Sequence, residues 1–356
     1  MALSDQLEEA AFARQVEADR LAADEARTVR RELAALAAAM VAALRKAAPN
    51  ERASLTRQLK SLDRTIKHFD GDLVNTYNRL KNHNKKLLAE LAQDEADHLQ
   101  KAVATAAGAG LLWRKLTPKK ADAVIEVLDI EGEPLVEWWS RQRSGVRRDF
   151  RRQMRAGLTA GEDMPALVAR IQGSVGQRGR GGLMGVARRH AETLVKTSMH
   201  AARQEARMEV YKTHPEIVTH VQAMNEAPVS DICQARAGRV WPIGREPGRP
   251  PWHPNCKTTL IPIIRPLSRM ERRQLPQQLR DELSGLTRDK RVGLNGKPAA
   301  GLAPEVIFKK MPRAQAAKLL GPKRLALFED GKLNFRQLVD QTGRPRTLDE
   351  LKALAD

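Results

Sequence analysis

The sequence predicts a predominantly helical α+β fold: a long N-terminal helical hairpin, a mixed domain with a small antiparallel sheet, and an irregular basic tail. Three observations predict it. Aromatic residues are only 4% of the 356 residues, so Leu, Val and Ala must build the core, which suits helices better than a β-sandwich. Residues 5–47 contain neither Gly nor Pro. Only two later stretches, 217–224 and 258–264, have strand character.

The first element is predicted to be one long helix over residues 5–47, which Pro49 ends. A second helix is expected from Glu51 to about Ala106, with Gly71 as a candidate kink. A short turn at 48–50 favours an antiparallel hairpin. The second helix carries the 4-3 spacing of a coiled-coil seam, at Leu55, Leu59, Leu62, Ile66, Phe69 and Leu73. Because this seam is narrow and flanked by charge, it slightly favours an extended arm over a compact helical core.

The middle of the chain, residues 115–265, is expected to form the mixed domain. Its predicted helices cover 119–129, 135–157, 164–172 and about 186–212. The second of these has an apolar face spaced by four residues, namely Val146, Phe150, Met154 and Leu158. The Gly-rich basic run 173–185 predicts a flexible loop. The two strands are expected to pair antiparallel, with Pro262 favouring an edge position.

The tail, residues 266–356, is basic and punctuated by Pro. We expect short helices near 269–283, 312–320 and 334–340, and interpret the segment as one that docks onto a partner. The chain therefore divides, on sequence grounds, into a hairpin over 1–110, a mixed domain over 115–265 and a docking segment over 266–356.

The formal net charge of +19 indicates a polyanionic neighbour, with double-stranded DNA as the first candidate and an acidic protein or membrane surface as the second. No stretch approaches 18 consecutive apolar residues, so no membrane-spanning helix is expected. The first residues lack the apolar region of a signal peptide, which favours synthesis in the cytoplasm. No Gly-x-x-x-x-Gly-Lys-Ser/Thr motif occurs, which argues against a nucleotide-hydrolysing motor.

Arginines are densest between residues 141 and 155, on the helix face opposite the apolar one. The candidate nucleic-acid contacts are Arg148, Arg151, Arg152 and Arg155, with a second group at Arg178, Arg180, Arg188 and Arg189. Such groups contact phosphates without reading sequence. Few aromatic residues lie among them, which argues against base stacking. The alternative is a solvated face whose arginines pair with carboxylates elsewhere.

Both cysteines lie in one Pro- and Gly-rich segment, between residues 231 and 256. The flanking strands would bring them together with a histidine and a carboxylate, and this set is a candidate tetrahedral zinc site: Asp231, Cys233, His253 and Cys256. A thiol pair, reduced or cross-linked, and packing without any bond remain open alternatives. Nothing in the sequence supplies the third group of a Cys–His enzyme, so His253 is expected to be a turn histidine bonded to backbone carbonyls.

Several stretches resemble the Mu F-like phage head morphogenesis family, over roughly residues 115–356. The matching stretches are Leu128-Asp-Ile-Glu-Gly132 with Trp138-Trp139, Arg155-Ala-Gly-Leu158, Glu192-Thr-Leu-Val-Lys-Thr197, Asp231-Ile-Cys233, Pro250-Pro-Trp-His-Pro-Asn-Cys256, Gly321-Pro-Lys-Arg324, Gly331-Lys-Leu333 and Leu338-Val-Asp-Gln341 through Leu348. The segment from Asp231 to Cys256 is the most specific. The family often has two further thiols, where Arg236 and Thr258 stand here.

The resemblance implies a non-enzymatic minor capsid protein of a tailed phage, present in the virion at the portal vertex and inner capsid. Its implied partners are portal protein, major capsid protein and packaged double-stranded DNA, without a membrane, a small-molecule substrate or a required cofactor. Two alternatives stay open. One is a DNA-processing nuclease packaged with the genome, and the other is a DNA-binding assembly factor absent from the mature particle.

Overall fold

The structure is a computed structural model, and it describes ten segments of the chain: residues 3–46, 54–107, 115–173, 181–215, 218–225, 230–246, 248–256, 258–264, 321–333 and 346–355, with the single residues 273, 277, 313, 317 and 337. The fold class is confirmed as predominantly helical α+β with a small antiparallel sheet. Among these residues, no helix combines the length and apolar character that a membrane span requires.

Backbone contacts divide the chain into two units that do not follow the expected linear domains. Unit 1 contains residues 1–18, 89–126 and 199–356, and unit 2 contains residues 19–88 and 127–198. The difference arises because three long helices each contribute to both units: α1 (Leu3–Lys46), α2 (Leu55–Ala107) and α6 (Leu183–Tyr211). The hairpin is thus not a unit of its own in this division.

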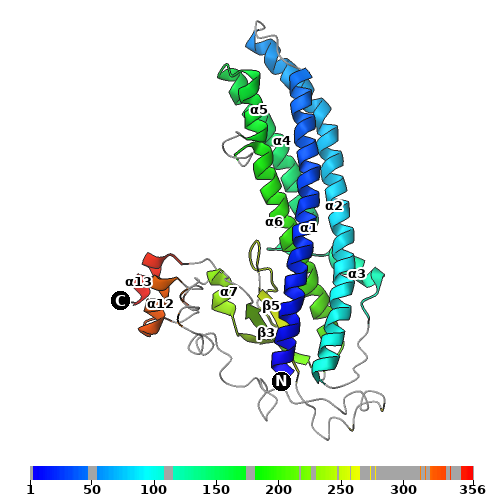
Figure 1. Ribbon diagram of the computed structural model, residues 1–356, viewed down its shortest axis with the longest axis vertical. Coiled ribbons are helices and arrows are strands. Elements are labelled where there is room, and N and C mark those ends of the chain that lie inside the picture. Colours follow the sequence, from blue (N-terminus) through cyan, green and yellow to red (C-terminus); the bar gives the residue numbers. More distant parts are fainter. Residues whose placement is uncertain are drawn as a thin grey trace. The chain divides into compact units, whose positions relative to one another are not determined.

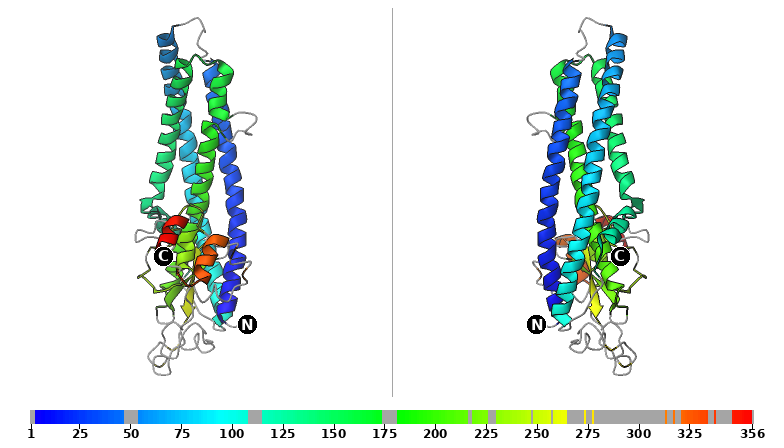
Figure 2. Two further views of the ribbon diagram at one scale, coloured as in Figure 1. Left: turned by 90° about the vertical axis from the view of Figure 1, so that its left-hand side faces the viewer. Right: turned by 90° about the vertical axis from the view of Figure 1, so that its right-hand side faces the viewer.

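Unit 2 is a helical bundle. Figures 1 and 2 show residues 19–46 of α1, 55–88 of α2, α4 (Leu135–Thr159) and 183–198 of α6 side by side, with α5 (Met164–Gln172) packed on α4. The ion pairs Glu25–His83 and Glu32–Arg79 show that α1 and α2 are antiparallel, as predicted.

The predicted seam of α2 forms the core of unit 2. Leu62, Ile66, Phe69 and Leu73 are buried, whereas Leu55 near the helix start is 42% exposed. The seam also meets the apolar face of α4, where the ring centroids of Phe69 and Phe150 are 5.7 Å apart. Within unit 2 the hairpin is therefore part of a compact helical core, and the preference for a free extended arm was wrong there. The helix α2 also continues through Gly71, so the helix does not break at that position.

A β-hairpin with a two-residue turn precedes α4. Strands β1 (Asp129–Ile130) and β2 (Glu133–Pro134) pair antiparallel around Glu131 and Gly132, whose φ angles are +55° and +83°. Two consecutive residues with positive φ are the signature of a tight type I′ hairpin turn. The Asp129 carboxylate accepts a 2.6 Å hydrogen bond from the Gly132 backbone N–H and holds the turn closed.

Unit 1 holds the sheet. Its strand order is β4-β3-β5, all antiparallel, with β3 (Val218–Asn225) between β4 (Val240–Pro242) and β5 (Thr258–Ile264). Among the described strands β5 is at an edge, which is where Pro262 is tolerated. Helix α6 packs on β5, and the Tyr211 hydroxyl donates a 3.0 Å hydrogen bond to the Leu260 carbonyl.

The remaining described helices of unit 1 are α3 (Pro118–Glu126), α7 (Asp231–Arg236), α12 (Pro322–Glu329) and α13 (Leu348–Ala355).

The tail is not wholly irregular. Leu325 of α12, Leu333 just after α12 and Leu351 of α13 form a small apolar cluster with Ala235 of α7. The helices expected near 269–283, 312–320 and 334–340 lie outside the described residues, apart from isolated positions.

Candidate functional site

Cys233 is placed by the first turn of α7. Ser230 is the N-cap residue, and its hydroxyl accepts the backbone N–H of Cys233 at 3.4 Å. Ser is among the strongly preferred N-cap residues because its oxygen satisfies an N–H that has no partner within the helix. The same first turn carries the positive end of the helix dipole, which favours a thiolate. The side chain of Cys233 is buried.

The other two candidate ligands are fixed by the turn His253-Pro-Asn-Cys256. The Cys256 backbone N–H donates to the His253 carbonyl at 3.1 Å. Asn255 has a φ of +57°, in the left-handed region. Pro at the second position and Asn at the third, with positive φ, are characteristic of a type II turn. The turn therefore places the histidine and the thiol at its two ends, next to the first residue of β5.

These three side chains converge. Sγ of Cys233 lies 3.5 Å from Sγ of Cys256 and 2.9 Å from Nε2 of His253. All three candidate ligand atoms lie within 4.8 Å of one another. Nδ1 of His253 is 2.9 Å from the Pro254 carbonyl, which can only accept, so Nδ1 carries the proton. Nε2 faces Sγ of Cys233 and the Ser230 hydroxyl, which is 2.8 Å away.

The two thiols are electrostatically unequal. The hydrogen bond from the Cys256 thiol lowers the pKa of Cys233 to about 4, against the opposing effect of burial, and His253 adds to the lowering. The same bond, together with burial, raises the pKa of Cys256. Arg236 lies 4.4 Å from the ring centroid of Trp252, and its positive charge also acts on both thiols. One thiolate is thus available as a ligand at neutral pH.

The structure does not bring Asp231 into this cluster. Its carboxylate pairs with Arg324 of α12, and it is absent from the converging set. In its place the cluster is bordered by Ser230, Arg236 and Trp252. The sequence signals for these were a Ser-Asp pair typical of a helix N-terminus and the Arg that replaces a thiol of the resembled motif.

The predicted arginine face of α4 is largely paired with carboxylates. Arg155 donates to both oxygens of Asp63 at 3.0 and 2.8 Å, and Arg151 approaches Asp63 at 3.6 Å. Arg148 and Arg152 meet only Asp149 of α4 itself, at 3.9 and 3.0 Å, and their side chains are 76% and 67% exposed. Arg148 and Arg152 are therefore the most exposed of the four arginines predicted to contact DNA on this helix.

The second arginine group is only partly described. Arg178 and Arg180 lie outside the described residues. Arg188 is half-buried, and its Nε donates to the Met184 carbonyl at 3.2 Å, whereas Arg189 is exposed.

Unit 1 also holds a buried ionic cluster that no local pattern in the sequence indicates. Glu95 of α2 accepts hydrogen bonds from Arg203 at 2.8 Å, from Arg207, both on α6, and from Arg14 of α1 at 3.0 Å. All four side chains are buried. Burial by itself would raise the pKa of Glu95, but Arg207 and Arg203 more than offset this and hold that pKa well below its usual range.

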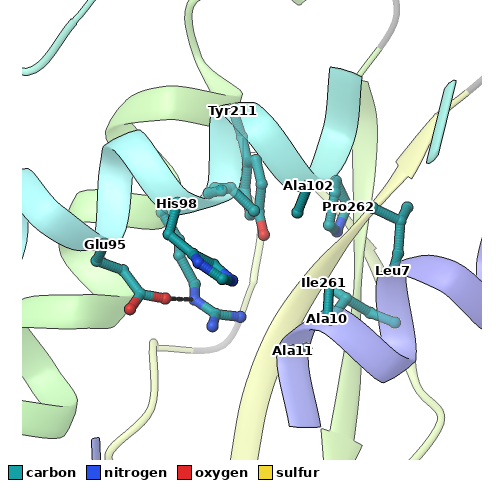
Figure 3. A pocket seen from close by; sticks show the side chains of 11 residues that line it. Leu7, Ala10, Ala11, Glu95, His98, Ala102, Tyr211, Ile261 and Pro262 are labelled. Carbon is teal, nitrogen blue, oxygen red and sulfur yellow. Dashed lines mark hydrogen bonds and ion pairs between the residues drawn. The ribbon is translucent and has the colours of Figure 1, made fainter. Parts of the chain in front are cut away.

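A small cavity adjoins this cluster (Figure 3), between Glu95, His98, Tyr211 and the apolar residues Leu7 and Ile261. Its volume is about 10 Å³, and a cavity of about that size holds one water molecule. This interior is therefore a structural ionic centre, and it is too small for an organic ligand.

Comparisons of the chain with models of protein families, with characterised proteins and with solved structures found no match.

Proposed function

We propose that this chain is a structural minor head protein of a tailed phage, which acts by binding portal protein, major capsid protein and packaged DNA within the virion. The proposal starts from the family resemblance of residues 115–356. A structural head protein needs motifs that build contact surfaces, and it does not need a substrate-binding centre.

One structural observation supports the proposal most strongly. The Cys-containing motif and the tail motif, both of which carry the family resemblance, pack against each other. Arg324, in the matching tail motif, pairs with Asp231 of the Cys-containing motif. Leu325 and Leu351 of the tail pack around Ala235 of α7. Residues some 90 positions apart thus form one small module. A docking role for both motifs explains why they occur together in one sequence.

The surface of α4 supports a DNA contact. Arg148 and Arg152 project their guanidinium groups from one exposed side of the helix, and Arg147, Arg151 and Arg155 turn toward carboxylates of α2. With a net charge of +19, long-range attraction to a polyanion is strong at low ionic strength.

The burial of the two thiols favours a structural role over a nucleophilic one. Cys233 is 0% and Cys256 is 3% exposed, and a covalent nucleophile must meet its substrate. The nuclease alternative would need a reacting centre open to a DNA strand.

The test is mass spectrometry of purified particles and procapsids from the phage or prophage that encodes the chain, with co-purification against its portal protein. We expect a few copies in both particles and retention by immobilised portal protein. Absence from mature virions, with presence in procapsids, would favour the assembly-factor alternative. A metal-dependent cleavage of plasmid by the purified chain, abolished by His253→Ala, would favour the nuclease.

A further inference from the structure

We infer that Cys233, His253 and Cys256 bind one zinc-like divalent cation, which joins α7 to the start of β5. This inference goes beyond the proposed function, since a structural metal would be present whether or not the chain is a head protein. Its basis is the convergence of one imidazole and two buried thiols on one point.

The distances fit a metal better than they fit a disulfide. Tetrahedral zinc, with Zn–S near 2.3 Å and Zn–N near 2.0 Å, separates two sulfurs by about 3.8 Å and a sulfur from a nitrogen by about 3.5 Å. The observed separations are 3.5 Å for the two sulfurs and 2.9 Å for Cys233 Sγ and His253 Nε2. Insertion of the ion therefore needs outward shifts of a few tenths of an ångström. A disulfide needs the sulfurs to close to about 2.05 Å.

The orientation of the imidazole suits a metal ligand. A ligating histidine must be neutral, and it usually donates its other ring N–H to a backbone carbonyl or carboxylate, which fixes the ring orientation. Here Nδ1 donates to the Pro254 carbonyl at 2.9 Å and Nε2 faces the thiols.

The charge balance also suits a dication. Two thiolates and one dication are neutral together, so the buried centre would carry no net charge. Ser230 Oγ lies 2.8 Å from Nε2, and the fourth coordination position can be filled by this oxygen or by a water. Asp231 is not required, because its carboxylate pairs with Arg324.

A metal would stabilise a segment that has little core of its own. Among the described residues between α7 and β5, the only regular element is the three-residue strand β4, and three glycines have positive φ: Gly238, Gly244 and Gly248. Cross-linking the two ends of such a segment restricts the unfolded chain, and binding energy then becomes folding energy.

The experiment is elemental analysis of the full-length chain, purified without chelator or added metal and kept reduced. We expect close to one equivalent of zinc in the wild type, and at least about a tenfold loss in Cys233→Ser, Cys256→Ser and His253→Ala. The control is His220→Ala, a histidine in β3 of the same sheet, which should retain the metal. Helix content by circular dichroism shows whether each variant is folded.

Cobalt substitution provides a readout that needs no variant. Replacement of zinc by Co²⁺ should produce sulfur-to-cobalt charge-transfer absorption and the visible bands of tetrahedral coordination, in a one-to-one titration. No metal in the reduced wild type and no cobalt bands in the folded chain would overturn the inference. A Cys233–Cys256 disulfide in freshly isolated protein, found by mass spectrometry, would also overturn it.

Discussion

Arg324 of α12 forms an ion pair with Asp231, the first residue of α7, and so joins the tail of the chain to the segment that carries both cysteines. Both side chains are mostly buried, at 25% and 13% exposure. Arg324 also donates to the Arg346 carbonyl at 3.2 Å, ahead of α13. The pair therefore holds α12, α13 and α7 together beside the apolar cluster around Ala235.

Breaking this pair should release the tail. In Asp231→Ala and Arg324→Ala we expect faster proteolytic cleavage ahead of α12, and a double-mutant cycle should give a coupling free energy of about 1–2 kcal/mol. The control is Arg313→Ala, whose ion pair with Glu329 is exposed and should contribute little to stability.

The same variants test how Asp231 acts. If the carboxylate only binds Arg324, Asp231→Ala and Arg324→Ala should retain bound metal equally. Loss of metal in Asp231→Ala alone would show that Asp231 is a ligand, as the sequence first suggested.

Replacing Glu95 should be among the most destabilising single changes. Glu95→Gln leaves Arg14, Arg203 and Arg207 without their shared buried carboxylate, and removal of one partner from such a cluster costs about 3–5 kcal/mol. The matched control is Asp97→Asn, an exposed carboxylate on the same helix. Urea denaturation measures both free energies of unfolding. Equal stability of the two variants would contradict a structural role for the cluster.

Glu95 should also make the stability of the folded chain depend on pH in the acid range. Its pKa is lowered in the folded chain from an ordinary value of 4.5. The unfolded state therefore binds the proton more tightly than the folded state. The carboxylate contributes its full stabilisation to the folded chain above pH 4.5, and this stabilisation is lost as the pH falls below that value. Between about pH 5 and pH 3 the wild type should lose stability more steeply than Glu95→Gln. Parallel curves would show that Glu95 is not the group responsible.

The arginines of α4 should separate into two functional classes. The double substitution of Arg148 and Arg152 by Ala should weaken duplex DNA binding and reduce the slope of log affinity against log salt by about 2. The double substitution of Arg147 and Arg155 should mainly lower stability, by about 1 kcal/mol, because these residues pair with Asp70 and Asp63. Binding that is insensitive to salt, or equal losses in both variants, would argue against a DNA surface at Arg148 and Arg152.

Local patterns predicted most single elements well. The apolar face of α4, the helix Met164–Gln172 and the strand Thr258–Ile264 follow directly from spacing, Gly and Pro positions and β-branched composition. The pairing of β3 with β5 also follows, because it joins the two strands with the clearest signal.

Features that depend on distant partners were not predictable. Glu95 and Arg207 are 112 residues apart, and nothing in either local sequence distinguishes them from surface charges. The carboxylates that neutralise the α4 arginines, Asp63 and Asp70, lie on α2 and are visible only once the helices are packed. Asp231 was placed in a metal site by its closeness in sequence to Cys233, whereas its partner comes from the tail.

Two glycines of α4 should respond oppositely to alanine. A methyl group at Gly157 would lie 2.4 Å from Cδ2 of Leu167 and 2.8 Å from a carboxylate oxygen of Glu162, whereas one at Gly145 would meet nothing within 4 Å. Gly145→Ala should therefore stabilise the chain by about 0.5–1 kcal/mol through helix propensity alone. Gly157→Ala gains the same propensity but must push α5 away from α4.

Overpacking of that kind typically costs about 1–3 kcal/mol, so the net effect at Gly157 should be destabilising. Thermal and urea unfolding of the two variants, with Gly71→Ala in α2 as a second open position, give the comparison. Stabilisation by Gly157→Ala would mean that α5 is free to move off α4, and that the close contact through Gly157 is not needed to hold this end of the bundle together.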